Sequence, residues 1–148
     1  MSPPVDARDH LGRWPRVLLA AWAVALVAVL VVARRLEPDP RGFGTHTQLG
    51  LAPCAFRAAT GRPCPTCGMT TAFARFARGE LAGSWRANPA GAVLAPGALA
   101  LAAWLAVASA LGRPAPFRGW DAPLVGVAGA VFVLTLVSWL VRMTLGGS

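Results

Sequence analysis

Three long stretches of uncharged, apolar residues constrain this chain more than any other feature of its sequence. They run over residues 17–33, 89–111 and 122–141, and none contains an ionisable side chain. At 1.5 Å per residue the shortest is about 25 Å long, near the lower limit for crossing a bilayer. Because backbone amides in lipid must be satisfied within their own segment, we expect three membrane-spanning helices.

Composition agrees with a membrane protein that has little room for a separate soluble domain. Of the 148 residues, 55% are hydrophobic and 14% are charged, whereas soluble proteins are roughly 25% charged. We therefore predict an all-α integral membrane protein with a tail over residues 1–16, a single membrane domain over 17–141 and a second tail over 142–148. The lack of charge in the three stretches argues against an ion pump or ion-coupled transporter.

The first apolar stretch has an alternative interpretation as a cleaved signal peptide that ends near Ala33. Its apolar core is long for a signal, and Arg34 and Arg35 would directly follow the cleavage site. Both features favour a membrane span.

Small residues recur at every fourth position in the second and third stretches. They are Ala98, Ala102, Ala106 and Ala110, followed by Ala122, Gly126 and Ala130. Such strips let another helix approach closely, so we expect contacts with a second copy of the chain or with other membrane proteins, and with the lipid bilayer elsewhere. Pro96 lies inside the second stretch and predicts a kink, because it removes a backbone hydrogen bond.

All 14 basic residues are Arg, and the formal net charge is +8. No aromatic-basic recognition module accompanies them, so we expect no nucleic-acid partner and assign the charge to loops that face anionic headgroups. Three spans would place five Arg on the N-terminal side and nine on the side of the long first loop. The positive-inside rule then predicts a multi-pass protein of the cell membrane with this loop in the cytoplasm.

The loop over residues 36–88 carries all three cysteines. Cys64 and Cys67 form a Cys-x-x-Cys pair, and Cys54 lies ten residues earlier. This spacing lets two thiols form a disulfide or bind one metal ion. Zinc is the metal that the pattern favours, and because structural zinc takes four ligands, His46 is the nearest candidate for the fourth.

A short amphipathic helix is expected after the Cys pair, from Gly68 or Met69 to Gly79. Its predicted apolar face is Met69, Phe73 and Phe76, and its predicted polar face is Thr71, Arg75 and Arg78. We expect this helix to rest in the headgroup layer. Its N-terminus and Arg75 would make Cys67 the more acidic thiol.

An ordered string of residues through this loop resembles a known bacterial membrane family, catalogued as domain of unknown function 2752. The string is Cys54, Phe56, Gly61, Pro63, Cys64, Pro65, Cys67, Gly68, Thr70, Gly79, Glu80, Leu81, Asn88 and Pro89, within residues 51–94. The family typically has Arg after the Thr, where this chain has Thr71. The resemblance implies a small multi-pass protein and supplies no activity.

We expect the turn that presents the thiols to be shaped by its glycines and prolines. These are Gly61, Pro63, Pro65 and Gly68. Asn88 is expected to cap the second span, with Pro89 at its first helical position.

Three functions fit the sequence. A non-catalytic structural or accessory membrane module is favoured over an enzyme, because no Ser/His/Asp, phosphate-binding or paired-carboxylate motif is present. The second is a zinc-binding membrane protein, because the Cys-Pro-x-Cys-Gly segment resembles one knuckle of a zinc ribbon. The third is a membrane thiol-disulfide protein that uses Cys64 and Cys67, although no thioredoxin-type pattern surrounds the pair.

Overall fold

The computed structural model describes residues 11–112 and 121–145, and side chains over 11–112 and 125–144. In these ranges the chain is helical and contains no strand, which confirms the all-α class. The elements are α1 (Arg13–Arg35), the 3-10 helix η1 (Thr45–Leu49), α2 (Ala55–Thr60), α3 (Met69–Phe76), α4 (Leu81–Ala87), α5 (Pro89–Leu111) and α6 (Asp121–Leu145).

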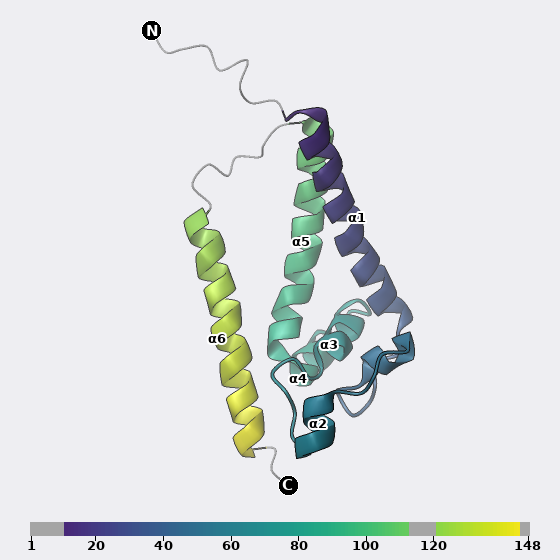
Figure 1. Cartoon of the computed structure of the whole chain (residues 1–148), viewed down its shortest axis with the longest axis vertical. Helices are drawn as coiled ribbons and strands as arrows, with labels where there is room; N and C mark the ends of the chain where they lie inside the picture. The colour runs from purple at the N-terminus through teal and green to yellow at the C-terminus, as the bar shows by residue number, and fades with distance from the viewer. Residues whose placement is uncertain (1–10, 113–120, 146–148) are drawn as a thin grey trace.

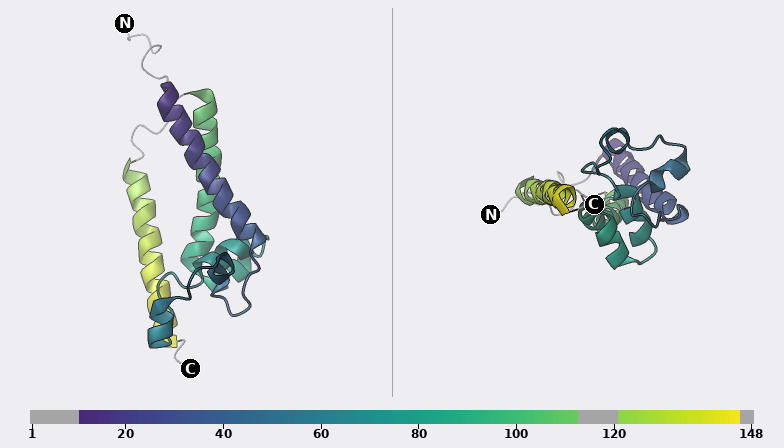
Figure 2. Two further views of the ribbon diagram at one scale, coloured as in Figure 1. Left: turned by 45° about the vertical axis from the view of Figure 1, so that its right-hand side comes forward. Right: turned by 90° about the horizontal axis from the view of Figure 1, so that it is seen from below.

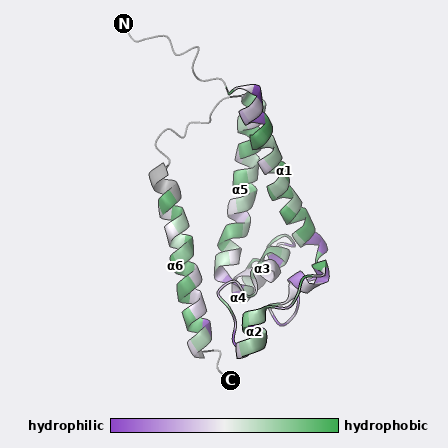
Figure 3. Ribbon diagram, in the orientation of Figure 1, coloured by the Kyte–Doolittle hydropathy of each residue, from purple (hydrophilic) through white to green (hydrophobic). Residues whose placement is uncertain are grey.

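Three of these helices, α1, α5 and α6, are long and apolar enough to cross a membrane, as predicted. Their ribbons are mostly hydrophobic along their length, and the polar residues gather at the ends and in the loop (Figure 3). The helix α5 continues through Pro96 without a break, and Pro96 is exposed on its surface, so the kink expected there stays a prediction.

The helices α1 and α5 pack along each other, while the short elements gather at the end of the pair where α1 finishes and α5 begins (Figure 1). At the opposite end, Arg16 donates hydrogen bonds to the carbonyls of Ser109 and Ala110, at 2.9 and 3.1 Å. The two helices are thus fixed to each other at both ends, and the loop between them is held against one side of the membrane domain.

The buried face of α5 differs from the strip of alanines predicted from the sequence. Ala102 is buried as expected, but Ala106 and Ala110 are exposed, and Leu105 and Ala108 take their place. A strip with a spacing of four drifts around a helix, by roughly 120° over twelve residues, because one turn takes 3.6 residues. The buried positions in this half of α5 are instead Ala102, Leu105 and Ala108, each three residues after the last.

The third span, α6, lies beside α5 (Figures 1 and 2) but buries little of its own surface. None of the side chains described within its apolar stretch is buried in the chain. Gly126 and Ala130, two of the predicted contact positions, are exposed, and the side chain of Ala122 lies outside the described residues. Their contact with a further helix stays a prediction.

The helix α3 lies at the centre of the loop and packs against α1, α4 and α5. It begins at Met69, as expected, but the prediction that Thr71 faces outward is wrong. Thr71 is fully buried, and its hydroxyl oxygen lies 2.8 Å from that of Thr45 in η1. The hydroxyl is satisfied because η1 folds over α3, and α3 is therefore part of the core of the loop.

Two glycines mark where backbones approach most closely around α3. Gly68 has a φ of +86°, and a Cβ added there would lie 2.4 Å from the carbonyl oxygen of Ala87 and 2.7 Å from that of Gly42. In α5, a Cβ added at Gly91 would lie 2.8 Å from the Cβ of Ala72. The start of α3 can therefore reach the start of α5 only because both positions lack a side chain.

We expect Gly68→Ala to destabilise the protein far more than Gly61→Ala. Both glycines have positive φ, which costs an Ala roughly 1–2 kcal/mol, but no atom lies within 4 Å of a Cβ at Gly61. At Gly68 the backbone itself must move, so the loss should exceed about 3 kcal/mol. Thermal unfolding of both variants in mild detergent measures the difference. Equal losses would show that the close approach at Gly68 is unimportant.

Candidate functional site

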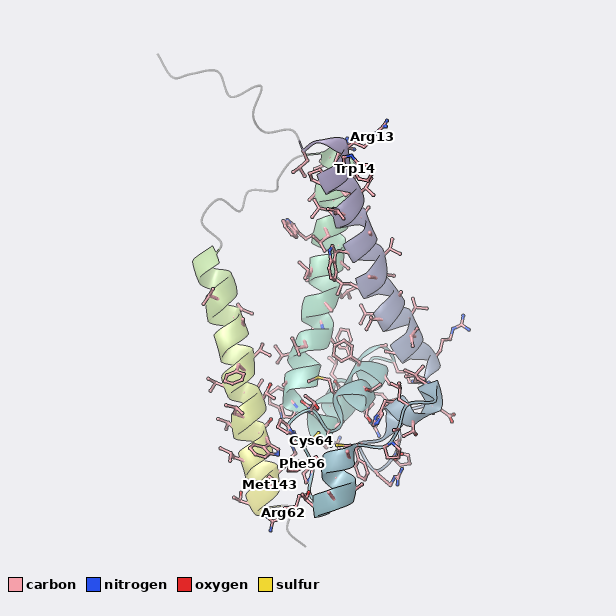
Figure 4. The ribbon with its side chains drawn as sticks, viewed as in Figure 1. Arg13, Trp14, Phe56, Arg62, Cys64 and Met143 are labelled. Carbon is pink, nitrogen blue, oxygen red and sulfur yellow. The ribbon has the colours of Figure 1, made fainter. Side chains whose placement is uncertain are left out.

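The three cysteine side chains converge at the end of the molecule where the loop is folded. Cys54 precedes α2, and Cys64 and Cys67 lie in the turn before α3, yet the three sulfur atoms all lie within 4.8 Å of one another. The Sγ of Cys67 is 3.0 Å from that of Cys64 and 3.7 Å from that of Cys54. Figure 4 labels Cys64 in this region, close to the C-terminal end of α6.

The turn that carries Cys64 and Cys67 is built from local backbone hydrogen bonds. The N–H of Cys67 donates to the carbonyl of Cys64 at 3.1 Å, and the N–H of Met69 donates to that of Thr66 at 3.0 Å. The N–H of Cys64 also donates to the sulfur of Cys67 at 3.2 Å. Prolines at 63 and 65 restrict the backbone on both sides of Cys64. The turn therefore presents both sulfurs on one side.

Asn88 ties this turn to the start of α5. Its side chain is fully buried, and its amide nitrogen donates to the carbonyls of Cys67 at 3.1 Å and Pro65 at 3.4 Å. Its amide oxygen accepts from the N–H of Gly91 at 3.0 Å, so the same residue caps α5, with Pro89 at the first helical position. One side chain thus positions both the thiol turn and the second span.

The last turns of α6 hold the other side of the cysteine turn. Arg142 donates to the carbonyls of Cys67 at 2.9 Å and Pro65 at 3.3 Å, and the indole N–H of Trp139 donates to the carbonyl of Pro63 at 2.9 Å. The Arg142 guanidinium also interacts electrostatically with the Cys67 and Cys64 thiols. Sequence reasoning missed both residues because nothing in a distant apolar span indicates contact with the loop.

The two thiols of the pair differ in acidity, and the order is the reverse of the predicted one. Burial raises the pKa of the Cys64 thiol, but hydrogen bonds from Cys67 and Thr66 outweigh it and bring that pKa to about 7. Burial and then the neighbouring Cys64 raise the pKa of Cys67 to about 12. Cys64 is therefore the more acidic thiol, because the hydrogen bonds at this pair favour its thiolate and disfavour that of Cys67.

Arg75 was predicted to stabilise the Cys67 thiolate, but its side chain lies away from the cysteine turn. Its guanidinium forms an ion pair with Glu80 at 2.8 Å, against Gly83 of α4. The cation that interacts with Cys64 and Cys67 is Arg142 of α6, and Arg57 of α2 lines the same pocket as the cysteines. Arg75 lies in the last turn of α3, whereas Cys67 precedes the first residue of that helix, so Arg75 does not reach the cysteine turn.

His46 is not part of the group of three sulfurs, although it was the predicted fourth ligand. Among the described residues, the group that could hold a metal consists of the cysteines alone. The Nε2 atom of His46 instead lies 3.2 Å from the carbonyl oxygen of Ala52. His46 and the cysteines do line the same pocket.

This pocket has a volume of about 740 Å³ and opens beside the sulfurs. All three cysteines line it, together with Phe43, Arg57, Met69 and Thr70 among others. The Arg57 guanidinium lies 3.5 Å from the centre of the Phe43 ring, a cation–π contact that fixes the cation on the pocket wall. The thiols are thus accessible to a small ligand on a side that also carries positive charge.

The spacing of the three sulfurs suits a thiolate-bound metal. With Zn–S bonds of about 2.3 Å, tetrahedral geometry separates sulfurs by about 3.8 Å. The 3.7 Å distance between Cys54 and Cys67 already matches, and the 3.0 Å distance between Cys64 and Cys67 must open by about 0.8 Å. The alternative chemistry open to the pair is thiol-disulfide exchange.

In metal-free, reduced protein we expect iodoacetamide to modify Cys64 before Cys67. The thiolate is the reactive form, and a pKa lowered to about 7 keeps Cys64 ionised above that pH, so its rate should fall as the pH drops through 7. Cys67 should react only in strongly alkaline solution. Pulsed alkylation across a pH series, followed by peptide mass mapping, measures both rates. Earlier modification of Cys67 would contradict this order.

Comparison with known proteins bears on this same part of the chain. Residues 54–102 match the model of a family described as protein of unknown function DUF2752. Searches of the curated proteins and of the solved structures gave no match. The matched segment contains the three cysteines, α2 to α4, Asn88 and the first part of α5. The resemblance predicted from the loop motif is therefore confirmed over residues 54–102.

Proposed function

We propose that this membrane protein binds a soft metal ion, with zinc favoured, through the thiolates of Cys54, Cys64 and Cys67. The observation that carries the proposal is the convergence of the three sulfurs within 4.8 Å, although Cys54 comes from a different segment of the loop. Packing alone does not require three thiols at one point. Soft thiolate ligands select Zn²⁺, Cu⁺ or iron–sulfur clusters over Mg²⁺ or Ca²⁺.

The surroundings of the thiols support a metal in two ways. Metal binding requires deprotonated sulfur, and the Arg142 guanidinium and backbone N–H of Cys64 both favour negative charge at the site. The turn is also held from two sides, by Asn88 and by Arg142. Hydrogen bonds to the segment that carries the ligands, such as these, orient the ligands of a metal site.

The role proposed for the metal is structural. An ion bound by Cys54 and by the Cys64–Cys67 turn would cross-link the segment before α2 to the start of α3, and so stabilise the loop against the spans. This agrees with a non-catalytic module in the membrane. A loop on the cytoplasmic side, as the arginine distribution favours, would keep the thiols reduced and available to the metal.

A second candidate, thiol-disulfide exchange, is favoured by the 3.0 Å separation of the Cys64 and Cys67 sulfurs. In this reaction the Cys64 thiolate attacks a disulfide of a partner protein and forms a mixed disulfide, with one partner sulfur leaving as a thiolate. The Cys67 thiolate then attacks Cys64, releases the second partner sulfur and leaves a Cys64–Cys67 disulfide. Metal binding would block this reaction by occupying both sulfurs.

Anaerobically purified protein should contain one metal ion per chain, and single Cys→Ser variants at 54, 64 and 67 should each weaken its binding. Loss of a direct ligand should weaken metal binding more than the 10–100-fold that is typical when a residue that orients a ligand is replaced. Intact mass, metal analysis and competition with a chelator measure stoichiometry and affinity.

Ala59→Ser is the matched control for these variants, because Ala59 is exposed on α2 and the substitution adds a serine to the same loop without removing a thiol. It should bind metal as the wild type does. Chelator-insensitive alkylation of all three cysteines, with no metal in the protein, would refute the proposal. A reductant-sensitive loss of two hydrogens would instead support the exchange reaction.

A further inference from the structure

We propose that the pocket beside the three thiols binds a small thiol that carries a carboxylate. The sulfur of this ligand would complete the coordination of the metal, and its carboxylate would pair with Arg57. The inference rests on the proposed metal site and adds the class of molecule that this site takes up.

The proposed metal needs a fourth ligand, and a molecule in the pocket can supply it. Zinc is almost always four-coordinate, and sites with three protein ligands take the fourth from water or from a bound molecule. The group among the described residues supplies three sulfurs, and His46 points its Nε2 toward the carbonyl of Ala52. All three cysteines line the pocket, so its interior is the side from which a ligand can reach the ion.

The size and lining of the pocket suit a small organic molecule. Its volume of about 740 Å³ falls within the range of roughly 300–1,000 Å³ that is usual for ligand sites. Phe43, Met69, Pro53 and Ala58 give it an apolar wall, which would cover the carbon atoms of a ligand. A free inorganic ion would leave this wall exposed to water.

Arg57 supplies the charge that selects an anion. Its guanidinium is half-buried over the Phe43 ring at 3.5 Å, and no described carboxylate forms an ion pair with it. The other arginine at the pocket, Arg41, is already paired with Asp39 at 2.6 Å. The N–H donors of Arg57 are therefore available to a carboxylate, which a guanidinium binds with two parallel hydrogen bonds.

The metal and Arg57 together identify the class of ligand. The metal selects a soft thiolate as its fourth ligand, and Arg57 selects a carboxylate on the same molecule. A molecule with only one of these groups would satisfy only one side of the pocket. A compact mercaptocarboxylate carries both, with a short apolar linker that suits the wall.

The experiment uses the full-length protein in detergent, loaded with Co²⁺ as a spectroscopic substitute for Zn²⁺. Three probes are titrated: 3-mercaptopropionate, which has both groups, 2-mercaptoethanol, which lacks the carboxylate, and propionate, which lacks the thiol. We expect 3-mercaptopropionate to bind at least about tenfold more tightly than 2-mercaptoethanol, as one charge-assisted interaction predicts. Both thiols should intensify the sulfur-to-cobalt absorption, whereas propionate should leave it unchanged.

Arg57→Gln should abolish the preference for 3-mercaptopropionate while leaving the binding of 2-mercaptoethanol unchanged. Arg62→Gln is the matched control: Arg62 lies five residues further along the loop, is exposed, does not line the pocket and lies below Cys64 in Figure 4. The control should keep the full preference.

Different results would contradict the metal site and the ligand proposed for its pocket. Absence of any cobalt–thiolate absorption before the probes are added would overturn the metal site itself and the inference with it. A normal cobalt site that binds the two thiols equally well, or that keeps its preference in Arg57→Gln, would overturn the inference alone. A cobalt spectrum that none of the probes changes would show that the fourth position is closed, and would also overturn it.

Discussion

The buried side chain of Asn88 is the constraint on which the rest of the loop depends. The turn that carries the thiols passes through the interior, where the carbonyls of Pro65 and Cys67 must find donors because an unpaired buried carbonyl is costly. Asn88 supplies its amide N–H groups to both, and its oxygen caps α5. A single residue at the membrane boundary thus fixes where the second span begins and where the sulfurs point. Gly68 is required by the same arrangement, because its backbone then lies against Ala87, the neighbour of Asn88.

The third span completes the site from the opposite side. No described side chain in the apolar stretch of α6 is fully buried, yet Trp139 and Arg142, near its C-terminal end, donate three hydrogen bonds to carbonyls of the cysteine turn. These contacts make the turn the point at which α5 and α6 are linked through the loop. Any change that displaces the carbonyls of Pro65 or Cys67, such as coordination or oxidation of the sulfurs, acts on both helices at once. A change at the thiols would therefore alter how α6 packs against the loop.

The sequence allowed the spans, the start of α3 at Met69 and the family of the loop to be predicted, because each depends on local composition or on residues close together in the chain. Features that depend on distant contacts could not be predicted. Thr71 is buried because η1 folds over it, and the strip through Ala106 and Ala110 fails because the helix geometry turns it away from α1. The acidity of the thiols depends on their burial and on hydrogen bonds among Cys64, Cys67 and Thr66, and the spacing of the cysteines in the sequence does not determine either. Arg142 lies 75 positions from Cys67 and joins the site only through the fold.

The charges around the sulfurs favour the proposed metal–thiolate site. A Zn²⁺ ion with three thiolates has a net charge of −1, and a fourth thiolate with a carboxylate adds two further negative charges. Anionic headgroups would repel such a cluster, and burial would penalise it further. Arg142, which interacts electrostatically with Cys64 and Cys67, and Arg57, which lines the same pocket as the cysteines, would supply two positive charges, and their partial burial would reduce screening by salt. In the proposed site, part of the basic excess of this chain would therefore stabilise the metal–thiolate cluster.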